Sequence, residues 1–190
     1  MDAAAAAALI PHGATVGMSG FTGAGYPKAL PQAIADRANA EHAQGRPYKI
    51  NLWTGASTAP ECDGALSQAH AIGQRLPFNT DPLARQQINA GEIDFIDMHL
   101  SHVAQHAWFG FFGKMNVAVI EVLGVTADGL LIPSTAIGNN KTWLEIADQV
   151  ILEVNTKLPG AMEGMHDIYY GTAIPPRRMP ISMTHADNRI

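Results

Sequence analysis

Short apolar segments alternate with helical patterns along most of the sequence, and this alternation restricts the fold more than any other feature. Residues 15–18, 48–53, 94–97 and 150–154 are predicted strands, and residues 116–122 form a strongly apolar strand that we expect to be buried on both faces. Strands that alternate with helices indicate an α/β fold with a mainly parallel sheet flanked by helices.

The helical segments carry ordinary start and stop signals. Helices are predicted at residues 30–44, 81–90 and 139–148, and the first two are followed directly by glycine. The alanine-rich start of the chain is predicted to form a further short helix. From about residue 159 the periodicity stops and prolines are frequent, so we expect an irregular extension.

Composition narrows the class of protein. A chain of 190 residues, 47% hydrophobic and 15% charged, can bury one sizeable core, so we expect one domain. The net charge of -5 is spread along the sequence and gives neither a basic stripe for nucleic acid nor a polybasic lipid anchor. No stretch approaches the roughly 20 apolar residues of a membrane-spanning helix. The single cysteine, Cys62, is interpreted as a packing residue and fits a reducing compartment, so we expect a cytoplasmic protein.

A glycine-rich stretch at residues 20–27, GFTGAGYP, lies between a predicted strand and a predicted helix. Gly23, Ala24 and Gly25 would let backbone N–H groups approach a phosphate or carboxylate. The dinucleotide-binding pattern does not fit, because Tyr26 and Pro27 stand where a third glycine would be needed, and no Walker lysine follows. A tight turn that requires positive φ explains the same glycines equally well.

Two further loops contain hydroxyl groups, and the first of them follows a predicted strand. Ser57 and Thr58 come after the strand that ends at Trp53, and ligands of open α/β sheets bind at the carboxyl ends of strands. These hydroxyls either donate to a substrate oxygen or cap the next helix, and capping is the commoner role. Thr80 and Asp81 allow the same two interpretations, and we expect at least one of them to cap a helix.

The charged and metal-binding candidates give weaker signals. Glu121 ends the most apolar strand, where a carboxylate can serve as acid, base or nucleophile, although a hydrogen-bonded structural role is commoner. Glu61 is less buried by pattern. His99, His102 and His106 would share one face of a helix and could bind zinc, but no fourth ligand is evident and aromatic neighbours favour a packing role. We therefore expect no metal site.

Five segments, taken together and in order, resemble the acetyl-CoA hydrolase/transferase family, which includes acetate and propionate CoA-transferases. They are GMSGFTGAGYPKALP, NLWTGASTAPECDGALSQA, RLPFNTDPLARQQINAGEIDFIDMHLS, GKMNVAVIEV and EGMHDIY. The match runs across nearly the whole chain. The resemblance implies a CoA-transferase-like (NagB/RpiA-like) domain. It also implies a full-length enzyme of roughly 500 residues, which is longer than a single domain usually is, with its active site between two halves. Residues 1–190 would be the amino-terminal domain, with the carboxyl-terminal catalytic half absent.

The resemblance also implies a reaction. A glutamate attacks the acyl-CoA thioester, a glutamyl-CoA thioester forms, and a small carboxylate of the acetate, succinate or propionate class, or water, completes the cycle. Coenzyme A is then a substrate and no tightly bound cofactor is expected. The nucleophile belongs to the second half in relatives, so we expect no catalytic residue in this chain and no activity from it alone. Motif matching assigns Gly23, Ala24, Gly25, Ser57 and Thr80 to one wall of the substrate cleft.

The implied partners are the protein's own carboxyl-terminal half and, for the full-length protein, further copies of itself. The face that packs on the second half is expected to be apolar. Two alternatives stay open: a non-catalytic module that binds small anions or CoA, and a zinc hydrolase that uses the histidine cluster.

Overall fold

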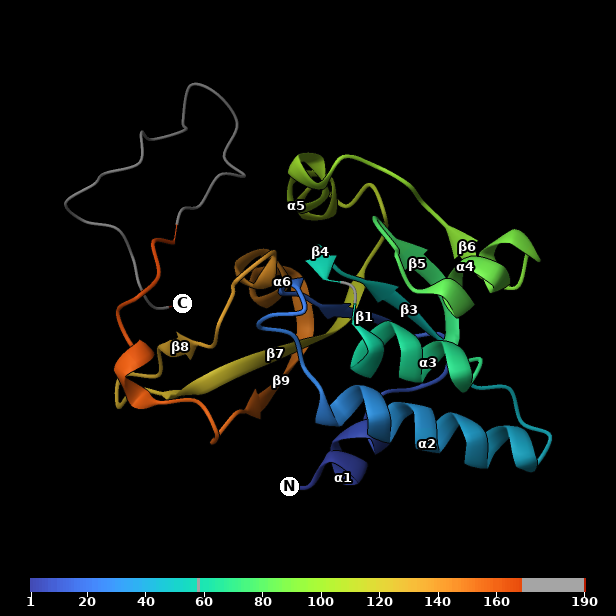
Figure 1. Cartoon of the computed structure of the whole chain (residues 1–190), viewed down its shortest axis with the longest axis horizontal. Helices are drawn as coiled ribbons and strands as arrows, with labels where there is room; N and C mark the ends of the chain where they lie inside the picture. The colour runs from blue at the N-terminus through green and yellow to red at the C-terminus, as the bar shows by residue number, and fades with distance from the viewer. Residues whose placement is uncertain (58, 169–189) are drawn as a thin grey trace.

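The computed structural model describes residues 1–57, 59–168 and 190, and within them a seven-stranded sheet forms the centre of the molecule (Figure 1). Its strands run in the order β6-β5-β3-β1-β7-β8, and β9 also pairs with β7. Every pair is parallel except β7 with β8. The strands are β1 (Thr15–Met18), β3 (Ile50–Trp53), β5 (Ile72–Leu76), β6 (Asp94–Phe95), β7 (Met115–Val125), β8 (Leu131–Pro133) and β9 (Ala147–Val154). The predicted α/β fold with a mainly parallel sheet is confirmed.

Helices cover both faces of the sheet. One layer contains α1 (Ala3–Ala8), α2 (Ala29–Ala43), the π-helical turn η1 (Pro60–Gly64) and α3 (Ala65–Gln68), and the opposite layer contains α5 (Leu100–Trp108) and α6 (Asn140–Ile146). The other helices are α4 (Pro82–Asn89) and the short 3₁₀ helix η2 (Gly160–Met162).

Strand β7 shows why the sheet needs two layers. Val117 and Val119 belong to the core cluster under α1 and α2, whereas Ala118 and Ile120 belong to the cluster on the side of α5 and α6. Successive side chains of a strand point to opposite faces, so a continuous apolar run is buried only between two helical layers. The expectation that this strand is buried on both faces is confirmed.

The sequence pattern missed or misplaced some elements. Strand β5 was not predicted, because Gly73, Gln74 and Arg75 interrupt its apolar character. Its Arg75 is nonetheless fully buried, because Asp63 of η1 neutralises it through an ion pair of 2.7 Å. Strand β8 was also missed. The last predicted helix ends at Ile146, and β9 begins directly at Ala147.

The end of the chain is described only in part. Residues 160–162 form η2, and most of the predicted irregular extension, residues 169–189, lies outside the described residues. Among the residues that the structure describes, no helix combines the length and apolar character needed to cross a membrane.

Candidate functional site

Three loops predicted to carry the site emerge at one edge of the sheet. Strands β1, β3 and β5 are neighbours and run parallel, so the segments that follow them leave from the same carboxyl edge. Two of these segments are joined by a second, two-stranded parallel sheet of β2 (Phe21–Thr22) and β4 (Ala56–Ser57), in which Thr22 is the partner of Ser57. The structure therefore brings the glycine-rich loop and the strand that carries Ser57 together.

Thr80 lies in the third loop, beside a small pocket. The pocket is lined by Ala59, Pro60, Thr80, Asp81 and Pro82. The Asp81 carboxylate accepts a hydrogen bond of 2.8 Å from the backbone N–H of residue 84, so the predicted helix cap is confirmed. The next helix after Ser57 is η1, and its N-cap residue is Ala59. Thr58 lies outside the described residues.

The glycines of the first loop have different reasons to be glycine. Gly25 has a φ of +69°, and a Cβ there would lie 2.5 Å from the backbone nitrogen and oxygen of Ala136. Gly25 is thus required by a tight turn and a close backbone approach. Gly23 is exposed, and a Cβ there would meet no atom within 4 Å. Of these two glycines, Gly23 is the one with open space in front of it.

A fourth segment, residues 134–139, completes this edge, although no motif in the sequence points to it. Asn139 donates from its backbone N–H to Ser19 Oγ at 2.7 Å, and its Nδ2 donates to the Thr54 carbonyl at 3.3 Å. A Cβ on Gly138 would overlap Ser19. The signal in the sequence was the turn-forming triplet Gly138-Asn139-Asn140, of which the two asparagines fell within the predicted helix at residues 139–148.

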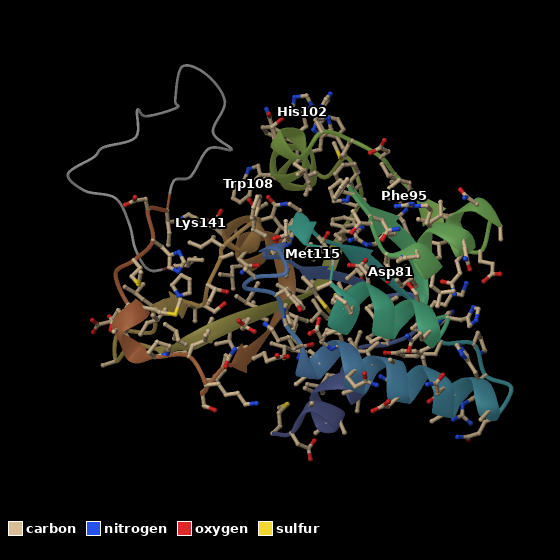
Figure 2. All side chains as sticks on the ribbon, viewed as in Figure 1. Asp81, Phe95, His102, Trp108, Met115 and Lys141 are labelled. Atoms are coloured by element: carbon tan, nitrogen blue, oxygen red, sulfur yellow. The ribbon has the colours of Figure 1, made fainter. Side chains whose placement is uncertain are left out.

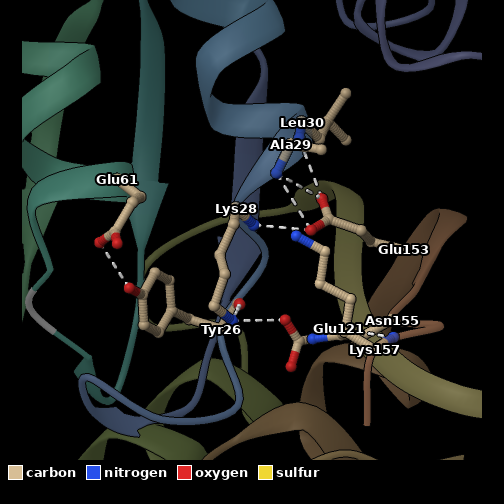
Figure 3. A network of polar contacts seen from close by, with 9 residues as sticks. All are labelled: Tyr26, Lys28, Ala29, Leu30, Glu61, Glu121, Glu153, Asn155 and Lys157. Carbon is tan, nitrogen blue, oxygen red and sulfur yellow. Dashed lines mark hydrogen bonds and ion pairs between the residues drawn. The ribbon is translucent and has the colours of Figure 1, made fainter.

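A chain of polar contacts anchors the glycine-rich loop to its surroundings (Figure 3). The Tyr26 hydroxyl donates to Glu61 Oε2 at 2.6 Å. Lys28 Nζ pairs with Glu121 Oε2 at 2.5 Å, donates to the Tyr26 carbonyl at 2.8 Å and lies 4.3 Å from the centre of the Tyr26 ring. Burial and the Glu61 carboxylate raise the pKa of Tyr26 well above its usual range, and the hydrogen bond from Tyr26 lowers the pKa of Glu61. Both carboxylates beside the loop are thus engaged by neighbouring groups.

The surroundings of Glu121 are those expected of a structural carboxylate. Its side chain is 1% exposed and pairs with Lys28, which lies 93 positions away in the sequence. A carboxylate that is buried and held by an ammonium group lacks the access to substrate that a nucleophile requires. The commoner of the two roles considered for Glu121 agrees with this geometry.

The N-terminus of α2, which follows the glycine-rich loop, is occupied by a side chain of the protein itself. The Glu153 carboxylate on β9 accepts hydrogen bonds from the backbone N–H groups of Lys28, Ala29 and Leu30 at 2.7 to 3.1 Å. A helix N-terminus favours an anion, and here Glu153 supplies it. Any phosphate or carboxylate bound by the loop would have to use other donors than these three.

Cys62 and the histidines were weak candidates in the sequence. Cys62 is 1% exposed within the core, and burial raises the pKa of its thiol well above its usual range, so its packing role is confirmed. The histidine rings lie in a row along α5, with centres 5.7 Å apart for His99 and His102 and 5.9 Å apart for His102 and His106. Within the described residues, no group of three or more histidine, cysteine or carboxylate side chains is arranged to hold a metal ion.

Solved structures share the fold of this chain. RipA from Yersinia pestis superposes with a TM-score of 0.62 and 18% identity, over 84% of this chain and 37% of that chain. Glutaconate coenzyme A-transferase from Acidaminococcus fermentans superposes with a TM-score of 0.57 and 13% identity, over 80% of this chain and 68% of that chain. The fold is therefore the α/β fold of CoA-transferases and their structural relatives.

The sequence comparisons then identify the family. The family model described as the acetyl-CoA hydrolase/transferase N-terminal domain matches residues 1–175. The chain belongs to the acetyl-CoA hydrolase/transferase family, which confirms the resemblance seen in the sequence.

Individual relatives cover almost all of the chain. The succinyl-CoA:acetate CoA-transferase of Clostridium kluyveri is 44% identical over 185 residues, 97% of this chain and 34% of the relative. The propanoyl-CoA:succinate CoA transferase of Escherichia coli is 45% identical over 190 residues, 100% of this chain and 38% of the relative. The acetyl-CoA hydrolase of Saccharomyces cerevisiae is 34% identical over 188 residues, 95% of this chain and 35% of the relative. The chain thus spans about a third of the length of the curated relatives that it matches.

Proposed function

We propose that this chain is the amino-terminal domain of an acyl-CoA:carboxylate CoA-transferase and supplies one wall of its substrate cleft. The observation that carries the proposal is the identity of 44% and 45%, over 97% and 100% of the chain, to two CoA-transferases. The acetyl-CoA hydrolase of Saccharomyces cerevisiae is 34% identical, which favours a carboxylate over water as the acceptor. The donor is an acyl-CoA thioester and the acceptor a small carboxylate.

The proposed reaction passes through an enzyme-bound thioester. A glutamate carboxylate attacks the thioester carbonyl, the carbon–sulfur bond breaks, and an acyl-glutamyl anhydride and the CoA thiolate result. The thiolate attacks the glutamyl carbonyl, which releases the first carboxylate and leaves glutamyl-CoA. The acceptor carboxylate then reverses these two steps. Glu121 is buried and paired with Lys28, so we assign the nucleophile to the part of the full-length protein outside these 190 residues.

The proposed wall consists of Gly23, Ala24 and Gly25 in the first loop, Ser57 on β4 and Thr80 beside the small pocket. Their support is position, because all three segments leave the carboxyl edge of neighbouring parallel strands. Hydroxyl and backbone N–H donors at such an edge can hold carboxylate oxygens without competing as nucleophiles. Gly23 is the position in the wall where a ligand can approach the backbone without displacing protein atoms.

A chimera tests this proposal. The aligned segment of the Escherichia coli relative is replaced by this chain, and CoA transfer from propanoyl-CoA to succinate, the reaction in that relative's name, is measured for the chimera and for the chain alone. We expect transfer by the chimera and none by the chain alone. Activity of the chain alone would place a nucleophile within it, and a folded but silent chimera, with CoA binding by the chain, would favour a non-catalytic binding module.

Two substitutions in the chimera test the wall. Thr80→Val removes an exposed hydroxyl beside the pocket and is expected to raise the KM for succinate by about tenfold, the equivalent of one lost hydrogen bond to a charged group. Thr156→Val removes another exposed hydroxyl, from the segment after β9, and serves as the matched control with an unchanged KM. Equal KM values for both variants would exclude Thr80 from the carboxylate site.

A further inference from the structure

The bridging segment, residues 134–139, lies where two loops of the proposed wall begin. Strand β9 occupies one side of β7, and β1 and β8 pair along the other side. Strand β8 runs antiparallel to β7 and ends opposite Val122, and β1 ends opposite Val119, so the chain leaves β8 toward the carboxyl end of β1. Helix α6, marked by Lys141 in Figure 2, follows the bridging segment and contacts β1 and β7, which anchors the segment at its far end.

Backbone packing fits the bridging segment closely against the glycine-rich loop. A Cβ on Gly25 would lie 2.5 Å from the backbone nitrogen and oxygen of Ala136, and a Cβ on Gly138 would lie 2.5 Å from the Gly20 carbonyl oxygen. Both glycines have positive φ, +69° for Gly25 and +53° for Gly138. A glycine on each side of this contact leaves no room for a side chain, so backbone atoms alone set the spacing of the two segments.

Asn139 connects the bridging segment to two loops at once. Its backbone N–H donates to Ser19 Oγ, directly after β1, at 2.7 Å, and its Nδ2 donates to the Thr54 carbonyl, directly after β3, at 3.3 Å. Ser19 and Thr54 are both 0% exposed. One residue therefore joins the start of the loop that carries Gly23 to the start of the segment that carries Ser57.

The side chain of Asn139 does not serve its own helix. Asn139 is the N-cap residue of α6, a position at which an asparagine side chain ordinarily accepts a hydrogen bond from the first turn. Among the residues that the structure describes, its side chain makes no such bond and instead reaches Thr54, which lies 85 positions away. The bridge to Thr54, and not helix capping, therefore accounts for an asparagine at this position.

We propose that Asn139 is a positioning residue of the substrate wall, which fixes the glycine-rich loop relative to the segment that carries Ser57. This inference rests on the proposed function, because it takes both segments as parts of the wall. The two segments also pair with each other, since Thr22 is the partner of Ser57, so a shift of either one displaces the donors of the wall from a bound carboxylate. A displacement of about 1 Å can lower a catalytic rate by about 100-fold.

Asn139→Ala removes the bond to Thr54, and Asn51→Ala is its matched control. Asn51 Nδ2 donates to the Gly13 carbonyl over the same distance, 3.3 Å, but from the start of β3, at the opposite edge of the sheet from the wall. Each variant loses one hydrogen bond from a side-chain amide to a backbone carbonyl, so we expect similar, small shifts of the urea midpoint. An additional effect of Asn139→Ala on the wall is then distinct from a loss of stability.

Hydrogen exchange of the chain alone measures the order of the glycine-rich loop without catalysis. Within this loop the N–H groups of Phe21 and Ala24 each donate to the carbonyl oxygen of the other residue, at 2.9 and 3.0 Å. We expect these two amides to exchange about tenfold faster in Asn139→Ala than in the wild type, and at the wild-type rate in Asn51→Ala. Unchanged exchange in Asn139→Ala would overturn the inference.

Kinetics of the Escherichia coli chimera test the consequence for the reaction. Asn139→Ala should lower kcat for transfer from propanoyl-CoA to succinate by about 10- to 100-fold and change the KM for succinate by less than about threefold, because the donors of the wall remain but lose their alignment. Asn51→Ala should leave both constants unchanged, and equal kcat values for the two variants would overturn the inference. A silent wild-type chimera would contradict only the proposed function, because exchange in the chain alone still decides whether Asn139 orders the loop.

Discussion

Replacing Lys28 with methionine tests whether the polar network under the glycine-rich loop stabilises the protein as its geometry indicates. Glu121 is 1% exposed, and Lys28, whose side chain is 38% exposed, holds its Oε2 at 2.5 Å. Methionine keeps most of the apolar stem of lysine but removes the charge. The substitution therefore leaves a buried carboxylate without its counter-ion and removes the cation from the Tyr26 ring.

The expected magnitude follows from this geometry. Opposite unit charges 2.5 Å apart attract by about 7 kcal/mol at an effective dielectric constant of about 20, and desolvation of Glu121 offsets much of that attraction. Loss of one partner from a fully buried pair costs about 3–5 kcal/mol. Lys28 is partly exposed, so water can reach the site, and we expect the free energy of unfolding to fall by about 2–3 kcal/mol.

Urea denaturation followed by tryptophan fluorescence measures this change, because Trp53 and Trp143 are buried in the native state. Lys114→Met is the matched control. Its ion pair with Asp148 has a similar length, 2.8 Å, but the side chains are 70% and 47% exposed, so we expect a change below about 0.5 kcal/mol. A Lys28→Met variant as stable as Lys114→Met would refute the reasoning, because burial of the carboxylate would then have no energetic consequence.

The remaining predictions concern the same loop and helix. Gly25→Ala is expected to lower the free energy of unfolding by about 2–4 kcal/mol, because Gly25 has a φ of +69° and a Cβ there would lie 2.5 Å from backbone atoms. A Cβ at Gly23 would meet no atom within 4 Å, so Gly23→Ala should change the free energy of unfolding by less than about 0.5 kcal/mol. Equal effects of the two substitutions in urea denaturation would contradict this. Glu153→Gln removes the anion from the N-terminus of α2 and should cost about 1 kcal/mol, seen as a lower melting temperature, and an unchanged melting temperature at low salt would argue against a helix-dipole contribution. Tyr26→Phe removes the hydrogen bond to Glu61 and should raise the pKa of that carboxyl toward 4.5 in an NMR titration. Because the pKa of Glu61 is lower in the folded state, its ionised carboxylate stabilises the fold above the ordinary pKa of 4.5, and this stabilisation is lost as the pH falls. The wild type should therefore lose more stability below pH 4.5 than Tyr26→Phe does, and parallel pH profiles of the two proteins would contradict this.

Local patterns predicted the site only where its residues share one segment. The loops that carry Gly23 and Ser57 could be placed at strand ends, because each directly follows a predicted strand, whereas the strand before Thr80, β5, was not predicted. The contacts of Glu153 with the start of α2 join residues that are 123 to 125 positions apart, and those of Asn139 with Ser19 join residues 120 apart. No periodicity or turn signal encodes such distances, so these partners could not be found.

The sequence by itself determined the α/β class, because the two-sided burial of residues 116–122 follows directly from an apolar run that only a sheet between helical layers can accommodate. It also determined the family, since five ordered segments resemble that family throughout. Only the tertiary structure decided that Gly25 serves backbone packing while Gly23 stays open, and that Glu121 is held by Lys28. The physical reason is that burial, charge pairing and close backbone approach depend on which segments, distant in the sequence, are in contact, and the fold of the whole chain determines these contacts.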